Sequence, residues 1–153
     1  MKILLKIIIY FFIFTSISFA DLIKPNSKLE PFDVLMIQLN SLKKNNIPYQ
    51  DAGIEQTWEF AHPINKSATG PLNRFKKMIY SDSYKILIKH ENNKTIVLNK
   101  TSTKLVYKVF ILSEIKKKYY YIWQIEKVIQ EGKFKNCWMT SGVSEPVYLG
   151  ETI

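Results

Sequence analysis

The spacing of apolar residues changes halfway along the chain, and this change constrains the fold more than any other feature. Between residues 31 and 79, apolar side chains recur every three or four positions, which is the spacing of one helix face. Between residues 84 and 143 they alternate with polar residues, as in strands that bury one face. Helices followed by strands predict an α+β domain, with the helices packed on one face of a bent antiparallel sheet.

Three helices are predicted in the first half. The first starts at Pro31, because proline suits the first helical position, and runs through PFDVLMIQLNSLKKNN. The second, AGIEQTWEFA, has Asp51 as its expected cap and ends before Pro63, since the residue before a proline avoids helical geometry. A loop, PINKSA, is expected next. The third helix is predicted to start at residues 69–71, where Thr-Gly-Pro combines a cap with proline.

Four to five strands are predicted in the second half. Together with the three helices they are expected to form a single domain, residues 31–143, between a polar leader (21–30) and a tail (144–153). The alternating segments are 84–90, 95–100, 104–114, 118–130 and 137–143. In the segment 118–130 one face is expected to hold Tyr119, Tyr121, Trp123 and Ile125. A sheet that wraps around the first helix leaves a cavity at its wide end, and this is the default ligand site.

Residues 1–20 have the pattern of a secretory signal peptide. Lys2 and Lys6 precede an apolar run that ends in small residues at Ala20. Cleavage between Ala20 and Asp21 is predicted, which would place the mature protein in a periplasm. The alternative is an uncleaved membrane anchor, but the apolar run from Ile7 to Ala20 is shorter than the ~20 residues that a span needs.

Charge and cysteine content argue against several functions. The formal net charge is +9, but the lysines are scattered, which indicates a solvated surface or an anionic partner. Nucleic acid is not expected as the partner of an exported chain. Cys137 is the single cysteine and is predicted to be a buried, inert thiol. With only His62 and His90 beside it, no metal site and no cofactor are predicted.

A longer motif spans the predicted helices. It comprises Gly53-Ile54, Trp58-x-Phe60-Ala61-x-Pro63-x-Asn65 and Thr69-Gly70-Pro71-Leu72-x-Arg74-Phe75-x-x-Met78. Together with CWMTSGV near the C-terminus, it resembles an uncharacterised bacterial and plastid-associated family, a domain of unknown function grouped with nuclear transport factor 2-like (cystatin-like cone) folds. The resemblance implies a cone-shaped fold that often dimerises through its sheet, and it implies no established activity. His62 stands where the family pattern has a small residue.

Arg74 is the most distinctive candidate ligand-binding residue, because it is the only arginine among 22 basic residues. Its planar head could clamp a ligand carboxylate or phosphate. The alternative is an internal brace, either an ion pair with Asp51, Glu55 or Glu59 or a bond to the neighbouring loop.

Four further residues are candidate ligand contacts: Asn65, Trp58, Gln38 and Gln124. Gln38 interrupts the apolar run VLMIQL, and Gln124 lies among apolar neighbours on a predicted strand. Polar groups in such places must find partners, so they line a wet cavity, face solvent or lie in a subunit interface.

No paired acid and base is evident, so no catalytic residue is assigned. The sequence favours a non-catalytic module that binds either a small ligand, anionic as the surplus of lysine indicates, or a protein. A homodimer through the sheet is a further prediction. Two alternatives remain open. An isomerase or dehydratase would need His62, Glu55, Glu59 or Glu126 inside the cavity with a shifted pKa. A membrane-associated accessory protein would keep its N-terminus.

Overall fold

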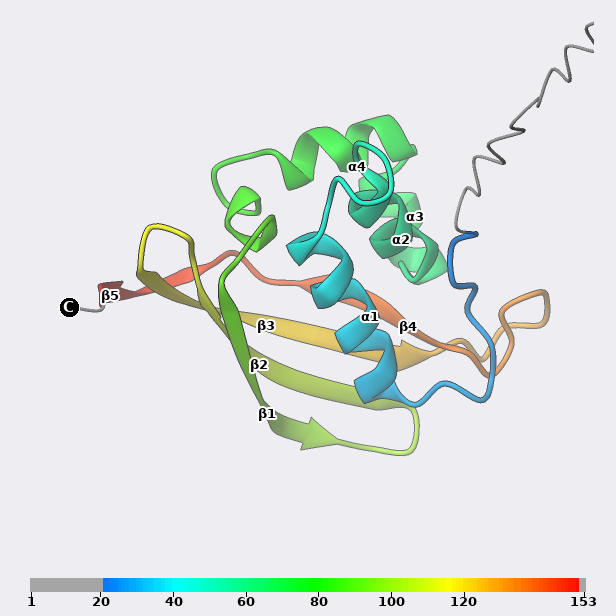
Figure 1. Ribbon diagram of the computed structural model, residues 1–153. Helices are drawn as coiled ribbons and strands as arrows, with labels where there is room; N and C mark the ends of the chain where they lie inside the picture. Colours follow the sequence, from blue (N-terminus) through cyan, green and yellow to red (C-terminus); the bar gives the residue numbers. More distant parts are fainter. Residues whose placement is uncertain (1–20, 152–153) are drawn as a thin grey trace, which may run out of the picture.

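Four α-helices lie on one face of a five-stranded antiparallel sheet in the computed structural model, which describes residues 21–151 (Figure 1). The helices are α1 (Pro31–Lys43), α2 (Ala52–Glu59), α3 (Pro63–Thr69) and α4 (Leu72–Ile79), and a 3-10 turn, η1 (Lys85–Leu87), follows them. The strands are β1 (Asn92–Lys100), β2 (Lys104–Leu112), β3 (Lys117–Lys127), β4 (Trp138–Val143) and β5 (Val147–Glu151). The predicted α+β class is therefore confirmed, while the predicted signal peptide lies outside the described residues.

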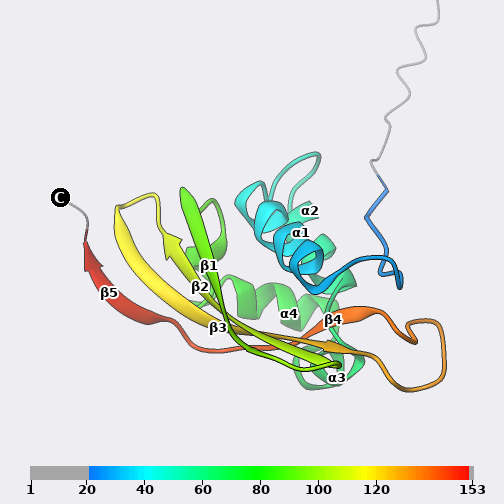
Figure 2. The same cartoon turned by 90° about the horizontal axis from the view of Figure 1, so that it is seen from below.

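The sheet is a meander with a divided edge. Strands β1, β2 and β3 pair in sequence, and β4 and β5 both pair with β3. Strand β4 takes the part of β3 from Trp123 to Lys127, and β5 takes the part from Lys117 to Tyr120. One edge of the sheet is thus β1, and the other is β4 followed by β5. Figure 2 shows the sheet bent beneath the helices, with β5 extending away from them.

The core lies between α1 and the inner face of the sheet, which is the face that the helices cover. Helix α1 buries Val34, Leu35, Leu39 and Leu42 there. On β3 the predicted inner face is confirmed, because Tyr121, Trp123 and Ile125 are buried while Tyr119 is half-buried.

The predicted number of helices is wrong, because the segment expected to be a loop forms α3. Pro63 was expected only to end the second helix, but it also takes the first position of a new one. His62 caps this helix, since its Nδ1 accepts a hydrogen bond from the Ile64 N–H at 3.2 Å. Residues 60–62 separate α3 from α2, and Ala61 among them forms a parallel bridge with Thr140 of β4.

Two predictions about the strands also need correction. Residues 84–90 were expected to form a strand, but they hold η1, in which the Leu87 N–H donates to the Tyr84 carbonyl and the Ile88 N–H donates to the Lys85 carbonyl. The segment predicted to be a tail contains β5, which pairs through Tyr148 with Tyr119 of β3. The bulge beside this pair breaks the alternation that would have revealed the strand.

Helices α1 and α2 approach each other closely at Gly53. A Cβ at this position would lie 2.0 Å from the Ser41 carbonyl oxygen, so only glycine allows the approach. Asp51, the expected cap of α2, makes no side-chain capping bond. The cap comes instead from Asn45, whose Oδ1 accepts from the Ile54 N–H at 2.9 Å.

Candidate functional site

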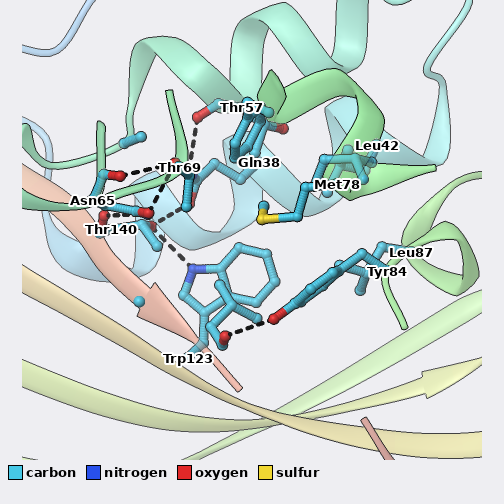
Figure 3. A pocket seen from close by; sticks show the side chains of 15 residues that line it. Gln38, Leu42, Thr57, Asn65, Thr69, Met78, Tyr84, Leu87, Trp123 and Thr140 are labelled. Atoms are coloured by element: carbon cyan, nitrogen blue, oxygen red, sulfur yellow. Dashed lines mark hydrogen bonds between the residues drawn. The ribbon is translucent and has the colours of Figure 1, made fainter. Parts of the chain in front are cut away.

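A cavity of about 240 Å³ lies between the helices and the sheet (Figure 3). Its apolar and aromatic walls come from α1, α4, η1, the sheet and the segment that follows α2: Leu42, Ala61, Phe75, Met78, Ile79, Tyr84, Leu87, Trp123 and Val143. Its polar lining residues are Gln38, Thr57, Asn65, Thr69 and Thr140. All four α-helices and two strands therefore contribute to one enclosure.

A chain of hydrogen bonds crosses the deep end of this cavity. The Gln38 amide nitrogen donates to the Thr57 carbonyl at 3.0 Å. The Thr140 hydroxyl donates to Gln38 Oε1 at 2.5 Å and accepts from the Trp123 indole N–H at 3.0 Å. Gln38 and Thr140 are only 1% and 2% exposed. Figure 3 shows the Trp123 ring projecting from the sheet with its nitrogen toward Thr140.

Gln38 keeps hydrogen-bonding capacity for a ligand. A side-chain amide offers two N–H donors and a carbonyl oxygen with two lone pairs. Within residues 21–151, each of these two groups makes one bond, to Thr57 and from Thr140. One N–H and one lone pair of this fully buried, cavity-lining side chain therefore make no bond within residues 21–151.

Half-buried residues mark the side of the cavity that is nearest to solvent. Asn65 donates to the Thr140 carbonyl at 3.1 Å, and Thr69 donates to the Asn65 carbonyl at 2.8 Å. On the other side of the opening, the Tyr84 hydroxyl donates to the Val143 carbonyl at 3.2 Å. Burial raises the pKa of Tyr84, and the charge of Glu145 raises it further, so this phenol is neutral near pH 7.

The cavity is electrically neutral. Among its lining residues in the described part of the chain, none is Asp, Glu, Lys, Arg or His. A charged ligand would lose its hydration there without gaining an opposite charge, at a cost of several kcal/mol per ion. The arrangement therefore suits an uncharged molecule, and it does not favour the small anionic ligand that the lysine content suggested.

Arg74 does not line the cavity. It is exposed on α4, and within residues 21–151 its side chain makes no hydrogen bond or ion pair. The internal brace belongs to Lys76, whose ammonium lies 2.8 Å from Glu55 and 3.6 Å from Asp51. Arg74 and Lys76 are two residues apart on α4, so their side chains project from nearly opposite faces of the helix. Only one of them can therefore face α2. The hydrogen bond from Lys76 holds the pKa of Glu55 below its usual range.

Trp58 and Gln124 also lie outside the cavity lining. The Trp58 ring packs on Phe75, with centroids 5.0 Å apart, and it fills the space beside Gly70, where a Cβ would approach the ring to 2.8 Å. Gln124 lies on the outer face of β3, opposite Gly142 of β4. Of the five candidate residues, the structure brings Gln38 and Asn65 together and leaves the other three outside.

The acids and the histidine considered for catalysis do not converge. Glu59 pairs with Lys24 at 3.1 Å, and Glu126 pairs with Lys104 at 2.8 Å. His62 is buried as the cap of α3, and burial holds its pKa below its usual range, against a smaller opposite effect of Glu126. None of these three residues, nor Glu55, lines the cavity.

Several lining residues were not predicted from the sequence, notably Thr57, Thr69, Tyr84 and Thr140. A signal did exist for Thr140, because it follows Trp138 at strand spacing and therefore shares its buried face. For the others the signal is absent, since their roles depend on contacts between distant helices.

Two further features are absent from residues 21–151. No group of three or more His, Cys, Asp or Glu side chains could hold a metal ion in this part of the chain. No helix in the same range is long and apolar enough to cross a membrane.

The chain was compared with protein-family models, with curated proteins and with solved structures, and none of them matches. The resemblance to the domain of unknown function, and with it the cone fold, therefore stays a prediction from the motif.

Proposed function

We propose that this protein is a non-catalytic binding module whose cavity takes one small, uncharged, largely apolar molecule. One observation carries the proposal: a cavity of about 240 Å³ has a neutral, mostly apolar lining and a buried amide, Gln38, with unused hydrogen-bonding capacity. The isolated amide at the deep end would orient a ligand, and the apolar walls would supply most of its affinity.

The energetic cost of the cavity supports a ligand-binding role. Unfilled space beside a protein core is destabilising, because the side chains around it lose packing contacts on one side. The mostly apolar walls of this cavity of about 240 Å³ therefore carry a cost that a filled core would avoid. A chain whose helices served only to cover the sheet would gain stability from larger side chains at these positions.

Volume and polarity together define the class of ligand. A cavity of about 150 Å³ accepts benzene, and pockets for drug-sized molecules start near 300 Å³. The intermediate size of this cavity suits a single ring or a short branched chain. A hydroxyl or carbonyl group on that molecule would bond to Gln38, because both groups match a free amide N–H or lone pair.

Catalysis is not favoured by the same geometry. Isomerases and dehydratases need a general acid or base within hydrogen-bonding reach of the substrate. The nearest candidates in sequence, Glu55 and His62, are held elsewhere by Lys76 and by the start of α3. A bound molecule would meet only amide, hydroxyl, indole and apolar groups.

The place of action and the finer fold are part of the proposal. The charged, apolar and small-residue pattern of residues 1–20 supports export to a periplasm. The bent sheet, with helices on its inner face and a cavity between them, supports a cone-shaped fold of the nuclear transport factor 2 type.

Nuclear magnetic resonance with three matched probes tests the proposal. Benzyl alcohol, benzoate and benzylamine share one ring but differ in charge. We expect benzyl alcohol to shift the indole N–H signal of Trp123, which lies on the cavity wall, and to leave that of Trp138 in place. Benzoate and benzylamine should bind at least tenfold more weakly, because each would bury a charge. Preferred binding of a charged probe, or no shift with any probe, would refute the proposal.

A further inference from the structure

Both edges of the sheet carry exposed apolar residues. Among the described residues, β1 pairs only with β2, and β5 pairs only with β3, so each has one free side. The exposed apolar residues are Ile96, Val97 and Leu98 on β1, and Val147, Tyr148 and Leu149 on β5, all between 42% and 55% exposed. An unpaired edge with such residues can add another strand, and native proteins normally protect it.

The two edges have matched charge patterns. On β1 the apolar triplet lies between Lys94 and Lys100, and on β5 the corresponding triplet lies between Glu145 and Glu151. All four charged residues are exposed. Glu151 also approaches Lys117 of its own chain at 3.7 Å, but both side chains of that pair are well exposed, so it contributes little.

These charges distinguish between the possible edge pairings. If β1 paired antiparallel with β1 of a second copy, Lys94 would lie near Lys100 at both ends. If β5 paired with β5, Glu145 would lie near Glu151. Like charges on adjacent strands are destabilising, and opposite charges stabilise the pair. Only the pairing of β1 with β5 places a lysine and a glutamate together at each end.

The faces of the two strands are compatible with this pairing. Val97 lies opposite Tyr107, and Tyr148 lies opposite Tyr119, so both project from the inner face of the sheet. An antiparallel pairing centred on Val97 and Tyr148 would therefore continue the sheet from one copy to the next, with both helical layers on the same side. In Figure 2 the free side of β5 points away from the helices, so they leave it accessible.

We infer that copies of this chain associate head to tail, with β1 of one copy pairing antiparallel with β5 of the next. This contact joins two different surfaces, so it leaves a free β1 and a free β5 at the ends of every open assembly. Unless the rotation between copies closes a ring, such contacts produce open chains of increasing length. The prediction differs from a two-fold dimer through the sheet face.

Native mass spectrometry and sedimentation velocity, on protein obtained by expressing the full chain, test this inference at increasing concentration and low salt. Two charge-reversal variants are needed, one on β1 (Lys94→Glu with Lys100→Glu) and one at the residues that flank the β5 triplet (Glu145→Lys with Glu151→Lys). A matched control for the β1 variant, Lys77→Glu with Lys133→Glu, lowers the charge by the same amount on exposed residues outside both strands. Circular dichroism confirms that each variant is folded.

We expect the wild type and the control to form a concentration-dependent series of dimer, trimer and longer species. Each charge-reversal variant alone should associate about tenfold more weakly than the wild type, because it brings like charges together. An equimolar mixture of the two variants should regain the series as mixed oligomers, since each edge again meets its opposite. A monomer at all concentrations, a dimer that neither reversal affects, or a mixture that stays monomeric would overturn the inference.

Discussion

The hydroxyl of Thr140 and the amide oxygen of Gln38 lie 2.5 Å apart, although 102 positions separate the two residues in the chain. This bond joins β4 to α1 at the deep end of the cavity. This bond and the bond from the Gln38 amide to the Thr57 carbonyl hold Gln38 in place, and we call the two bonds together the polar anchor. The anchor thus depends on the packing of three elements that are remote in sequence.

Replacement of Gln38 with leucine should destabilise the protein by about 1–3 kcal/mol, because it leaves the buried Thr140 hydroxyl without an acceptor for its hydrogen and removes the donor to the Thr57 carbonyl. Thr140→Val should have a similar effect, since it removes the acceptor of the Trp123 indole. The double variant should cost less than the sum of the two single variants, because the Gln38–Thr140 bond is then lost only once. Urea unfolding of all four proteins measures this difference, and strict additivity would contradict the described bond.

Arg74 and Lys76 provide a matched pair on one helix. Arg74→Ala should change the free energy of unfolding by less than about 0.5 kcal/mol, because the side chain is exposed and makes no hydrogen bond or ion pair within residues 21–151. Lys76→Ala should cost about 1 kcal/mol, because it leaves Asp51 and Glu55 close together without their shared cation. Chemical denaturation of both variants checks this order, and a larger loss at Arg74 would show that it has an unrecognised partner.

His90 should make the protein sensitive to mild acid. It is 1% exposed; burial holds its pKa below the usual value, the charge of Lys43 lowers it further, and the bond to the Leu87 carbonyl partly opposes them. Its Nδ1 lies 2.8 Å from that carbonyl and must carry the hydrogen, so Nε2 accepts from Asn93 at 3.0 Å. The folded state therefore resists protonation of this ring.

Because the folded pKa of His90 lies below that of the unfolded chain, its contribution to stability is complete above about pH 6.5 and is lost as the pH falls below that value. His62, whose pKa is also lowered by burial, acts in the same direction. Urea unfolding at pH 7.5 and 5.5 should show a loss that is smaller in His90→Gln. Equal losses in the two proteins would contradict the assignment. Glu55 and Glu126, whose pKa values are lowered by lysine partners, respond only below about pH 4.5.

Gly53 should tolerate no side chain. Gly53→Ala places a methyl group within 2.0 Å of the Ser41 carbonyl oxygen, so α1 and α2 must separate. Overpacking of this kind costs roughly 1–3 kcal/mol or more. Gly142→Ala is the control, because an added Cβ there meets nothing within 4 Å. Thermal unfolding of the two variants should give a clear fall in the melting temperature only for Gly53→Ala, and a fall of equal size in both would contradict the close approach of the helices.

The elements that the sequence predicted correctly are those in which burial follows a regular local period. The inner face of β3 and the helix at Pro31 are examples, since alternation and a first-position proline are visible in short stretches. The errors arose where one signal fits two structures. Pro63 was expected only to end a helix but begins α3, and residues 84–90 alternate as in a strand although Lys85–Leu87 form η1.

Only part of the candidate site was predictable from the sequence, and the reason differs from the one that limited the prediction of helices and strands. Gln38 and Asn65 could be found because a polar residue in an apolar stretch, or in a distinctive motif, attracts attention. Arg74 attracted attention because it is unique in composition, but composition does not determine on which helix face a residue lies. The brace formed by Lys76 and the anchor between Gln38 and Thr140 are set by the packing of distant elements.

Blocking the cavity tests the central claim most directly. Val143→Phe adds a ring at the half-buried opening, whereas Val106→Phe adds the same ring to a half-buried valine on the outer face of β2. The measurement is the titration of each variant with benzyl alcohol, followed by the Trp123 indole N–H signal. We predict that Val143→Phe abolishes the shift while Val106→Phe retains the wild-type affinity. Equal binding by both variants, or loss of binding only in Val106→Phe, would contradict a ligand site in this cavity.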